Sequence, residues 1–136
     1  MWFAFERMEE GLEKFLKHRG AAHFGDDRHT QWVCLLQCAC ALLFIHQRTA
    51  YMHRDLKPAN ILCVTAAGCA GGSEAITFKL TDLGMAKDVG ADDESLTATI
   101  AGTKRYWAPE MFDSPPRYSN SADWYSLGCI GFDLAY

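Results

Sequence analysis

The chain has 136 residues, of which 49% are hydrophobic and 22% are charged, and its formal net charge is −4. This length fits about one domain, and the composition is that of a soluble globular protein with enough apolar residues for a core. Because the charge balance is acidic, a broad basic surface for nucleic acid is disfavoured, and no nucleic-acid partner is expected.

The N-terminal stretch predicts a strand followed by a short helix. Residues 1–6 have the character of a strand that enters a turn. Beyond them, Leu12, Phe15 and Leu16 recur at the i, i+3, i+4 spacing of an amphipathic helix. Gly20 provides a stop for that helix.

The most apolar part of the sequence is VCLLQCACALLFI, at 33–45. It is 13 residues long and includes Gln37, whereas a membrane-spanning helix needs about 20 apolar residues. The stretch therefore predicts a buried core helix rather than a membrane span. Thr30 is expected to be the N-cap of this helix, which would end near Arg48.

The chain contains six cysteines. Three fall within the apolar helix at a spacing that lacks the paired ligands of a zinc site, so we expect buried free thiols there. No secretory signal is visible, and a reducing location in the cytoplasm or nucleus is therefore expected. The cysteines are Cys34, Cys38, Cys40, Cys63, Cys69 and Cys129.

Two strands are predicted in the middle of the chain. ILCV, at 61–64, has the character of a buried strand. TFKLT, at 77–81, alternates so that Phe78 and Leu80 share one face. The segment 65–76 between them is rich in small residues and glycine, which predicts a loop longer than most hairpin connections.

The C-terminal part predicts two loops and a helix. Residues 85–107 show little periodicity and many Asp, Thr and Gly residues, which is typical of a mobile loop suited to regulation. A second loop is expected at 113–122. From 123 onward, DWYSLGCIGFDLAY predicts a largely apolar helix.

Four short motifs follow one another along the chain: HRDLKPAN (53–60), DLG (82–84), WAPE (107–110) and SADWYSLGC (121–129). In this order they resemble the C-terminal lobe of a eukaryotic protein kinase, from the hinge to the F helix. The resemblance implies an α+β fold, mainly helical, with a small β-hairpin beside the catalytic loop and no N-lobe. Residues 1–136 would then form a partial kinase domain: hinge, D and E helices, catalytic loop, activation segment and the start of the F helix.

The resemblance assigns roles in phosphoryl transfer to four side chains. Phosphoryl transfer depends mostly on positioning and charge neutralisation, and Asp55 would accept the proton of the attacking hydroxyl. Asn60 and Asp82 would bind Mg²⁺ through oxygen atoms of the kind that this ion prefers. Lys57 matches the serine/threonine form of the motif, where it would neutralise the transferring phosphate and reach the hydroxyl of Thr103. The alternative for Asp55 is a turn-capping carboxylate.

The resemblance also implies an ATP site. FERM, at 5–8, falls where the hinge is expected. Phe5 would be the gatekeeper, and Glu6 and Met8 would offer backbone groups to the adenine. Leu62 would form the floor beneath the adenine ring.

Regulation is expected at the long loop. In kinases of this type the arginine before the catalytic acid, here Arg54, pairs with a phosphorylated loop residue. Ser95, Thr97 and Thr99 are the candidate sites for an upstream kinase. For each of them taken singly, a solvated polar loop residue is the alternative.

Pro58 concerns the local backbone, and three further matches to the family concern the internal framework. Pro58 argues against a helix in the catalytic loop. His53 and Leu83 would stack in the spine that links the two lobes, with Leu83 in the place of the usual Phe. Asp123 would hold the backbone around His53 and Arg54.

Three functions follow as hypotheses. The first is a serine/threonine protein kinase that transfers the ATP γ-phosphate to Ser or Thr hydroxyls of protein substrates. The chain contains no GxGxxG loop and no VAIK lysine, so little activity is expected from it alone. The second is a non-catalytic, kinase-like binding module. The third, a cysteine-rich metal-binding module, would require stoichiometric zinc.

Overall fold

The computed structural model describes residues 6–19, 28–49, 51–66, 75–83, 87–88, 103–114 and 119–135. Its helices and strands are β1 (Glu10–Gly11), α1 (Leu12–Arg19), α3 (Arg28–Arg48), β2 (Tyr51–Met52), β3 (Ile61–Ala66), β4 (Ala75–Leu80), β5 (Lys87–Asp88) and α4 (Asn120–Ala135). The described residues also include the 3₁₀ turns η1 (Pro58–Asn60), η4 (Lys104–Tyr106) and η5 (Pro109–Phe112).

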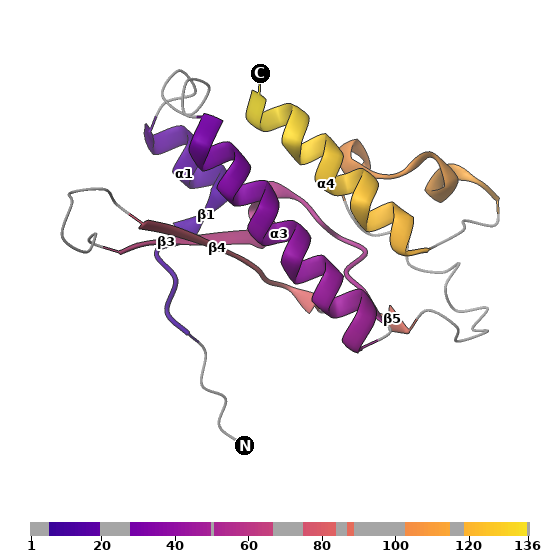
Figure 1. Cartoon of the computed structure of the whole chain (residues 1–136). Helices are drawn as coiled ribbons and strands as arrows, with labels where there is room; N and C mark the ends of the chain where they lie inside the picture. Colours follow the sequence, from indigo (N-terminus) through magenta and orange to yellow (C-terminus); the bar gives the residue numbers. More distant parts are fainter. Residues whose placement is uncertain are drawn as a thin grey trace.

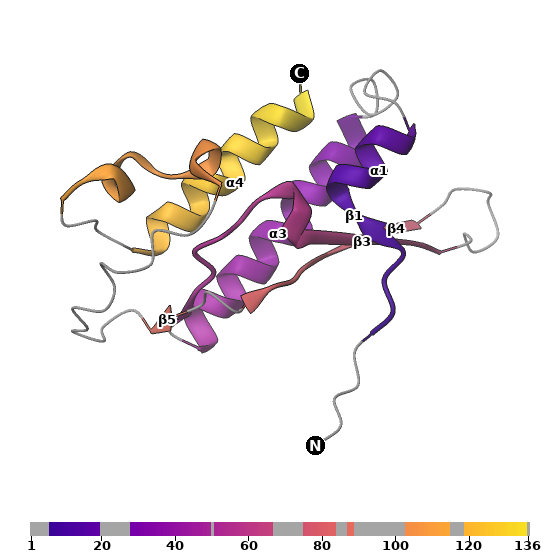
Figure 2. The ribbon, with the colours of Figure 1, turned by 180° about the vertical axis from the view of Figure 1, so that it is seen from behind.

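The two long helices, α3 and α4, lie side by side (Figure 1). Helix α3 also packs on the small sheet through β4, and the view from behind shows β1, β3 and β4 grouped on one side of this helix (Figure 2). The mainly helical architecture with a small β-hairpin sheet and the short β2–β5 pair confirms the predicted fold class.

The sheet has the order β1-β3-β4 and is antiparallel throughout. In the β3–β4 hairpin, Ile61 pairs with Leu80 and Ala66 pairs with Ala75. The beginning of β3 and the end of β4 therefore lie at the same end of the hairpin. As a result, the residues just before Ile61 and those just after Leu80 meet in space.

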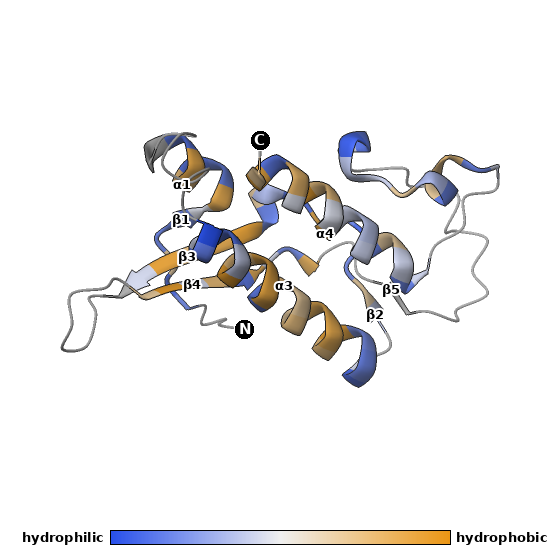
Figure 3. Ribbon diagram, turned by 45° about the horizontal axis from the view of Figure 1, so that its top comes forward, coloured by the Kyte–Doolittle hydropathy of each residue, from blue (hydrophilic) through white to orange (hydrophobic). Residues whose placement is uncertain are grey.

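Apolar side chains from α1, α3, α4 and the sheet pack into a core. The ribbons of these elements carry many hydrophobic residues, which are orange in Figure 3. The rings of Phe15 and Phe78 meet edge to face, with centroids 6.1 Å apart. A hydrogen bond to Cys38 and burial raise the pKa of the Cys34 thiol, so this thiol stays protonated and packs as a small apolar side chain. The buried members are Leu12, Phe15, Cys34, Cys38, Leu42, Leu56, Ile61, Cys63, Phe78, Leu127, Ile130 and Leu134.

Helix α3 is less buried than its sequence predicts. Trp32 is 70% exposed and Leu36 is 64% exposed, and Leu43 and Phe44 are exposed as well. By length and composition alone the helix could also cross a membrane, a test that core helices of soluble proteins pass too. The predicted N-cap is wrong, because Thr30 lies two residues inside the helix, where its side chain is buried.

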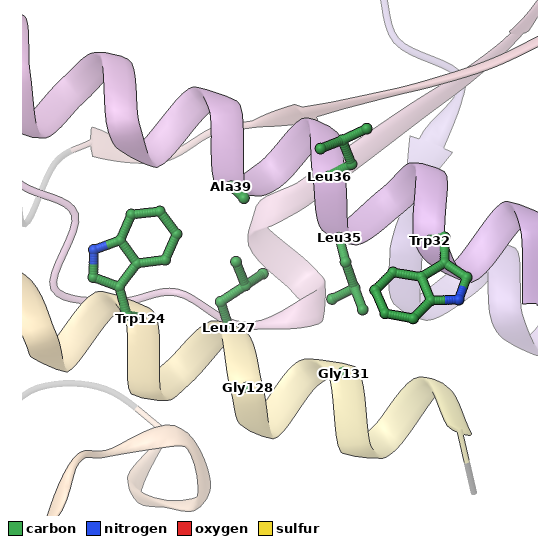
Figure 4. Close-up of a pocket in the computed structure, with 8 residues that line it drawn as sticks. All are labelled: Trp32, Leu35, Leu36, Ala39, Trp124, Leu127, Gly128 and Gly131. Atoms are coloured by element: carbon green, nitrogen blue, oxygen red, sulfur yellow. The ribbon is translucent and has the colours of Figure 1, made fainter.

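An apolar groove of about 470 Å³ runs between α3 and α4. Leu35 and Leu127 point into the space between the helices, and Trp32 and Trp124 lie toward its two ends (Figure 4). Gly131 faces Leu35 across this groove, and a Cβ atom at this position would stand 3.4 Å from the Leu35 side chain, an ordinary van der Waals contact.

Other elements differ in detail from the predictions. Pro58 does not exclude helix: it occupies the first position of η1, where its missing N–H costs nothing. The loop expected over 85–107 contains β5, which pairs with β2, and the 3₁₀ turn η4. Helix α4 begins at Asn120, three residues before the predicted start. Residues 1–5 and Cys69 lie outside the described residues.

Candidate active site

The backbone between β2 and β3 is held in an unusual conformation by one buried carboxylate. Arg54 has φ 68°, in the left-handed region that non-glycine residues seldom adopt. The N–H groups of His53 and Arg54 donate to Asp123 Oδ2 and Oδ1 at 2.8 and 2.9 Å. Since Asp123 is only 2% exposed, these bonds are shielded from water. The prediction that Asp123 holds this backbone is confirmed.

Three side chains predicted to act in catalysis form a hydrogen-bonded cluster. Lys57 Nζ lies 2.6 Å from Asp55 Oδ2, as a partly buried ion pair. Asn60 Nδ2 donates to the Asp55 carbonyl at 2.7 Å and to Asp55 Oδ2 at 3.1 Å. The aspartate is therefore fixed through one carboxylate oxygen, and its Oδ1 takes no part in these bonds.

The hairpin brings Asp82 to the same place. Thr81 N donates to the Asn60 carbonyl at 3.0 Å, and His53 Nε2 donates to the Thr81 carbonyl at 2.9 Å. Asp82, the next residue, is exposed and has a left-handed φ of 62°. Thr81, the residue before Asp82, thus contacts both Asn60 and His53. Asp82 therefore lies at the same end of the hairpin as Asn60 and His53.

The donor chemistry of this cluster suits Mg²⁺. The Asn60 amide nitrogen is bonded to Asp55, which directs its oxygen elsewhere, and the Asp82 carboxylate is exposed. Both are hard oxygen donors. Across the described ranges no group of three His, Cys, Asp or Glu side chains could hold a metal, so a magnesium ion here would need phosphate or water oxygens as further ligands. The metal-ligand assignment stays a prediction.

A cavity of about 390 Å³ opens beside the cluster. Lys57 and Thr103 both line it, together with Arg105 and Tyr106. The predicted reach of Lys57 toward Thr103 is therefore possible across the cavity, although the lysine Nζ bonds to Asp55. The remaining lining residues are Glu13, Pro58 and Ala59.

The turn η4 forms one wall of this cavity, and hydrogen bonds and an ion pair connect it to α4. Tyr106 donates its hydroxyl proton to Asp133 Oδ2 at 2.9 Å, and Arg105 forms an ion pair with the same carboxylate. Ser126 Oγ donates to the Tyr106 carbonyl at 2.6 Å. Burial, together with the hydrogen bond to Asp133, raises the pKa of Tyr106 to about 12.

The predicted hinge residues lie beside β3. Glu9 N donates to the Cys63 carbonyl at 3.1 Å, and β1 pairs with Leu62 and Cys63. The segment that contains Glu6 and Met8 therefore approaches the strand that carries Leu62. The side chain of Glu6 forms an ion pair with Lys79.

Several predicted positions are not brought together by this geometry. Phe5 lies outside the described residues, as do the candidate phosphorylation sites. Leu83 is 51% exposed and lines a cavity of about 420 Å³ with residues of α3 and β2, whereas His53 is fully buried. Their stacking stays a prediction. The candidate phosphorylation sites are Ser95, Thr97 and Thr99.

Sequence reasoning missed two residues of this region. His46 Nε2 lies 2.8 Å from Asp123 Oδ2, and Asp133 binds both Arg105 and Tyr106. A single histidine on an apolar helix gives no pattern that would identify its partner. Asp133 lies near the end of α4, beyond the SADWYSLGC motif, so no motif identified it.

Comparison with known proteins gives a consistent result. The family model described as "Protein kinase domain" matches residues 1–136. Serine/threonine-protein kinase nekl-2 from Caenorhabditis elegans is 37% identical over 98 residues, which are 72% of this chain and 24% of that protein. Serine/threonine-protein kinase 33 from Bos taurus is 31% identical over 135 residues, which are 98% of this chain and 26% of that protein.

A solved structure agrees in fold. The crystal structure of a kinase domain superposes with a TM-score of 0.62 at 22% sequence identity, covering 96% of this chain and 40% of the other. At this identity the likeness concerns the fold alone. The chain spans about a quarter of the length of the two curated relatives.

Proposed function

The chain belongs to the protein kinase family, and from this premise we propose that it forms the metal- and substrate-facing part of a serine/threonine protein kinase. The observation that carries the proposal is the hydrogen-bonded cluster of Asp55, Lys57 and Asn60, with Asp82 delivered to the same end of the hairpin. The relatives named above are serine/threonine kinases by name, which supports the class of acceptor.

Each side chain has a task in phosphoryl transfer. Asp55 accepts the proton of the acceptor hydroxyl, with the carboxylate held in place by Lys57 and Asn60. Lys57, already beside this carboxylate, stabilises negative charge on the phosphoryl group that moves past it. The cavity lined by Thr103 and Tyr106 receives the acceptor segment of the protein substrate.

Asn60 and Asp82 would hold Mg²⁺, and Glu6, Met8 and Leu62 would contact the adenine of ATP. When bound, the magnesium ion neutralises charge on the β- and γ-phosphates. The cysteines fit a reducing environment, so a cytoplasmic or nuclear location is proposed as well. The proposed partners are a protein substrate with a Ser or Thr acceptor and an upstream kinase.

A chimera tests the enzymatic proposal directly. The sequence carries no GxGxxG loop and no VAIK lysine, so we expect the chain alone to show little phosphate transfer from labelled ATP. Joined behind the N-terminal lobe of the nekl-2 relative, it should phosphorylate Ser and Thr in mixed peptides. Asp55→Asn should then lower the rate by about 10²–10⁴-fold. Asp113→Asn makes the same chemical change at an exposed aspartate outside the cluster and serves as the control.

The alternative is a non-catalytic, kinase-like binding module. A folded chimera that binds Mg²⁺-ATP but transfers no phosphate would favour this module and contradict the enzymatic proposal. Transfer to Tyr instead of Ser and Thr would contradict the proposed acceptor class. A thermal shift of the chain alone with Mg²⁺-ATP, together with measurable transfer, would refute the expectation that the isolated chain has little activity.

A further inference from the structure

The cavity beside the catalytic cluster is lined by more positive than negative side chains. Its charged lining residues are Lys57, Arg105 and Glu13. Tyr106 adds no charge at neutral pH, because burial and the hydrogen bond to Asp133 raise the pKa of the phenol to about 12. The cations thus outnumber the anion in this lining, although the chain as a whole has a net charge of −4.

The carboxylates that pair with the two cations do not line the cavity themselves. Lys57 Nζ bonds to Asp55 Oδ2, and Arg105 forms an ion pair with Asp133. Of this second pair, the Asp133 side chain is 16% exposed and the Arg105 side chain is 68% exposed. Because a guanidinium carries five N–H donors, Arg105 can bind a second carboxylate from the cavity while it keeps its bond to Asp133.

The one anionic lining residue, Glu13, already has a partner. Its Oε1 atom accepts a hydrogen bond from Lys17 Nζ at 2.8 Å, one turn further along α1. Both side chains of this pair are exposed. Because the two opposite charges are adjacent and in contact with water, Glu13 offers little attraction to a basic side chain of a substrate.

The cavity lies within one or two peptide residues of the predicted proton acceptor. Lys57 lines the cavity, and its Nζ atom lies 2.6 Å from Asp55 Oδ2. An extended peptide advances about 3.3 Å per residue. When its hydroxyl meets Asp55, the side chain of a neighbouring residue therefore reaches the cavity, whose volume of about 390 Å³ is sufficient for a side chain.

We propose that Arg105 is a specificity-determining residue, and that the cavity favours protein substrates with Asp or Glu one or two residues from the acceptor Ser or Thr. The substrate carboxylate forms charge-assisted hydrogen bonds with the guanidinium, and Lys57 adds attraction. A basic side chain at the same place is repelled by both cations. This inference rests on the proposed function, since it takes Asp55 as the point where the acceptor hydroxyl binds.

Peptide binding to the 136-residue chain tests the preference without phosphate transfer. Fluorescence anisotropy would compare labelled peptides that contain one Ser among Ala residues, with Glu or Lys at one of the two positions on either side. At one of these positions we expect Glu to bind about tenfold more tightly than Lys, and the difference to shrink at high salt. Equal affinities at every position, a preference for Lys, or no binding of any peptide would overturn the proposal.

Two variants assign the preference to Arg105. Arg105→Gln removes the guanidinium charge and should abolish the difference between Glu and Lys peptides. Lys104→Gln is the matched control, because it removes a cation from the neighbouring exposed position, which does not line the cavity. This control should retain the preference for Glu. Loss of the preference in both variants, or in neither, would overturn the role of Arg105.

A second measurement does not depend on any variant folding. Arg105 also pairs with Asp133, so circular dichroism must first show that Arg105→Gln is folded. In the unsubstituted chain, titration with the preferred Glu peptide should shift the side-chain Nε–H signal of Arg105 in nitrogen-15 spectra. Binding that leaves this signal unmoved would overturn the proposal.

The specificity proposal and the enzymatic proposal fail separately. If the chimera described above transfers phosphate equally to acidic and basic peptides, the specificity proposal is overturned and the enzymatic one stands. If the chimera transfers no phosphate while the chain binds the Glu peptide through Arg105, the enzymatic proposal fails and the preference for acidic peptides stands.

Discussion

The two halves of the contact between α3 and α4 are built in different ways. Where α3 ends, His46 and Asp123 are 5% and 2% exposed and satisfy one another through a hydrogen bond. Along the rest of the contact, the groove between the helices is apolar and open, and Trp32 remains 70% exposed. In the polar half, His46, His53 and Arg54 all hydrogen-bond to Asp123, whereas the apolar half leaves much of its surface in water.

The difference follows from the forces involved. Buried hydrogen-bonding groups must be matched individually, because each one left unpaired costs free energy. Apolar burial is non-directional and roughly proportional to area, so it can be left incomplete by degrees. The loop that carries Asp55 therefore owes its shape to contacts inside this chain, and the apolar helix faces add comparatively little to that shape.

The largest effect is expected from removing the centre of the polar half. Asp123→Asn replaces one acceptor oxygen by an amide that confronts N–H donors of His46, His53 or Arg54. We expect the free energy of unfolding to fall by about 3–5 kcal/mol, because several buried hydrogen bonds to one carboxylate are weakened or lost together. Urea unfolding monitored by circular dichroism measures this change.

Asp113→Asn makes the same chemical change at an exposed position and should lower stability by much less, because water screens the interactions of an exposed carboxylate. Equal effects of the two substitutions would mean that the polar half does not depend on Asp123.

A smaller loss is expected at the catalytic cluster. Asn60→Ala removes the two hydrogen bonds that the Asn60 amide donates to Asp55. The Asp55 carbonyl oxygen and Oδ2 each lose a donor. The free energy of unfolding should fall by about 1–3 kcal/mol. The matched variant is Asn120→Ala, since the Asn120 amide oxygen has no hydrogen-bond partner within the described part of the chain. A larger loss of unfolding free energy for Asn120→Ala than for Asn60→Ala would argue against a stabilising role of the hydrogen bonds between Asn60 and Asp55.

Tyr106 should make stability depend on alkaline pH. Its pKa is raised from 10.0 to about 12, mainly by burial and then by the bond to Asp133. Because the folded state holds the phenol proton more tightly than the unfolded state, the stabilisation is complete below about pH 10. It is lost as the pH rises from about 10 to about 12.

Tyr106→Phe should remove that pH-dependent part of the stability. Thermal unfolding at several pH values between about 9 and about 12 would show a smaller decline for the variant than for the unsubstituted chain. Parallel declines would mean that Tyr106 ionises as readily in the folded chain as in the unfolded one.

The smallest effect on stability is expected on the apolar half. Leu36 is 64% exposed on α3, so Leu36→Lys removes an apolar surface group while keeping a good helix former. The free energy of unfolding should change by less than about 0.5 kcal/mol. Light scattering should show less self-association, because exposed apolar patches promote it. A loss of more than about 1 kcal/mol would show that Leu36 already packs inside the fold.

Several features of the site could be predicted from the sequence because they depend on short separations along the chain. HRDLKPAN places Asp55, Lys57 and Asn60 close to one another in sequence, and the structure joins them by hydrogen bonds. The alternation around Phe78 identified its strand, and the hairpin then delivers Asp82. The roles of these residues in catalysis and metal binding remain predictions for the experiments above.

Longer-range features were harder to predict. The family resemblance led correctly to Asp123, 69 residues from Arg54, but no pattern indicated His46 as its partner. Thr30 was expected to cap α3, yet α3 already includes Arg28 and buries the Thr30 side chain. A cap depends on where the backbone leaves the helix, and the composition around Thr30 did not determine that point.

By itself, the sequence determined the family, the main helices and strands, and the order in which the candidate catalytic residues occur. Those properties follow from motif spacing and from periodicity, which act over a few residues. Only the tertiary structure decided that His46, Asp123 and the loop before Asp55 share one buried network, and that α3 leaves an apolar face in water. Such partnerships depend on which surfaces meet when the helices and the sheet pack, and many sequences with the same local patterns could pack in other ways.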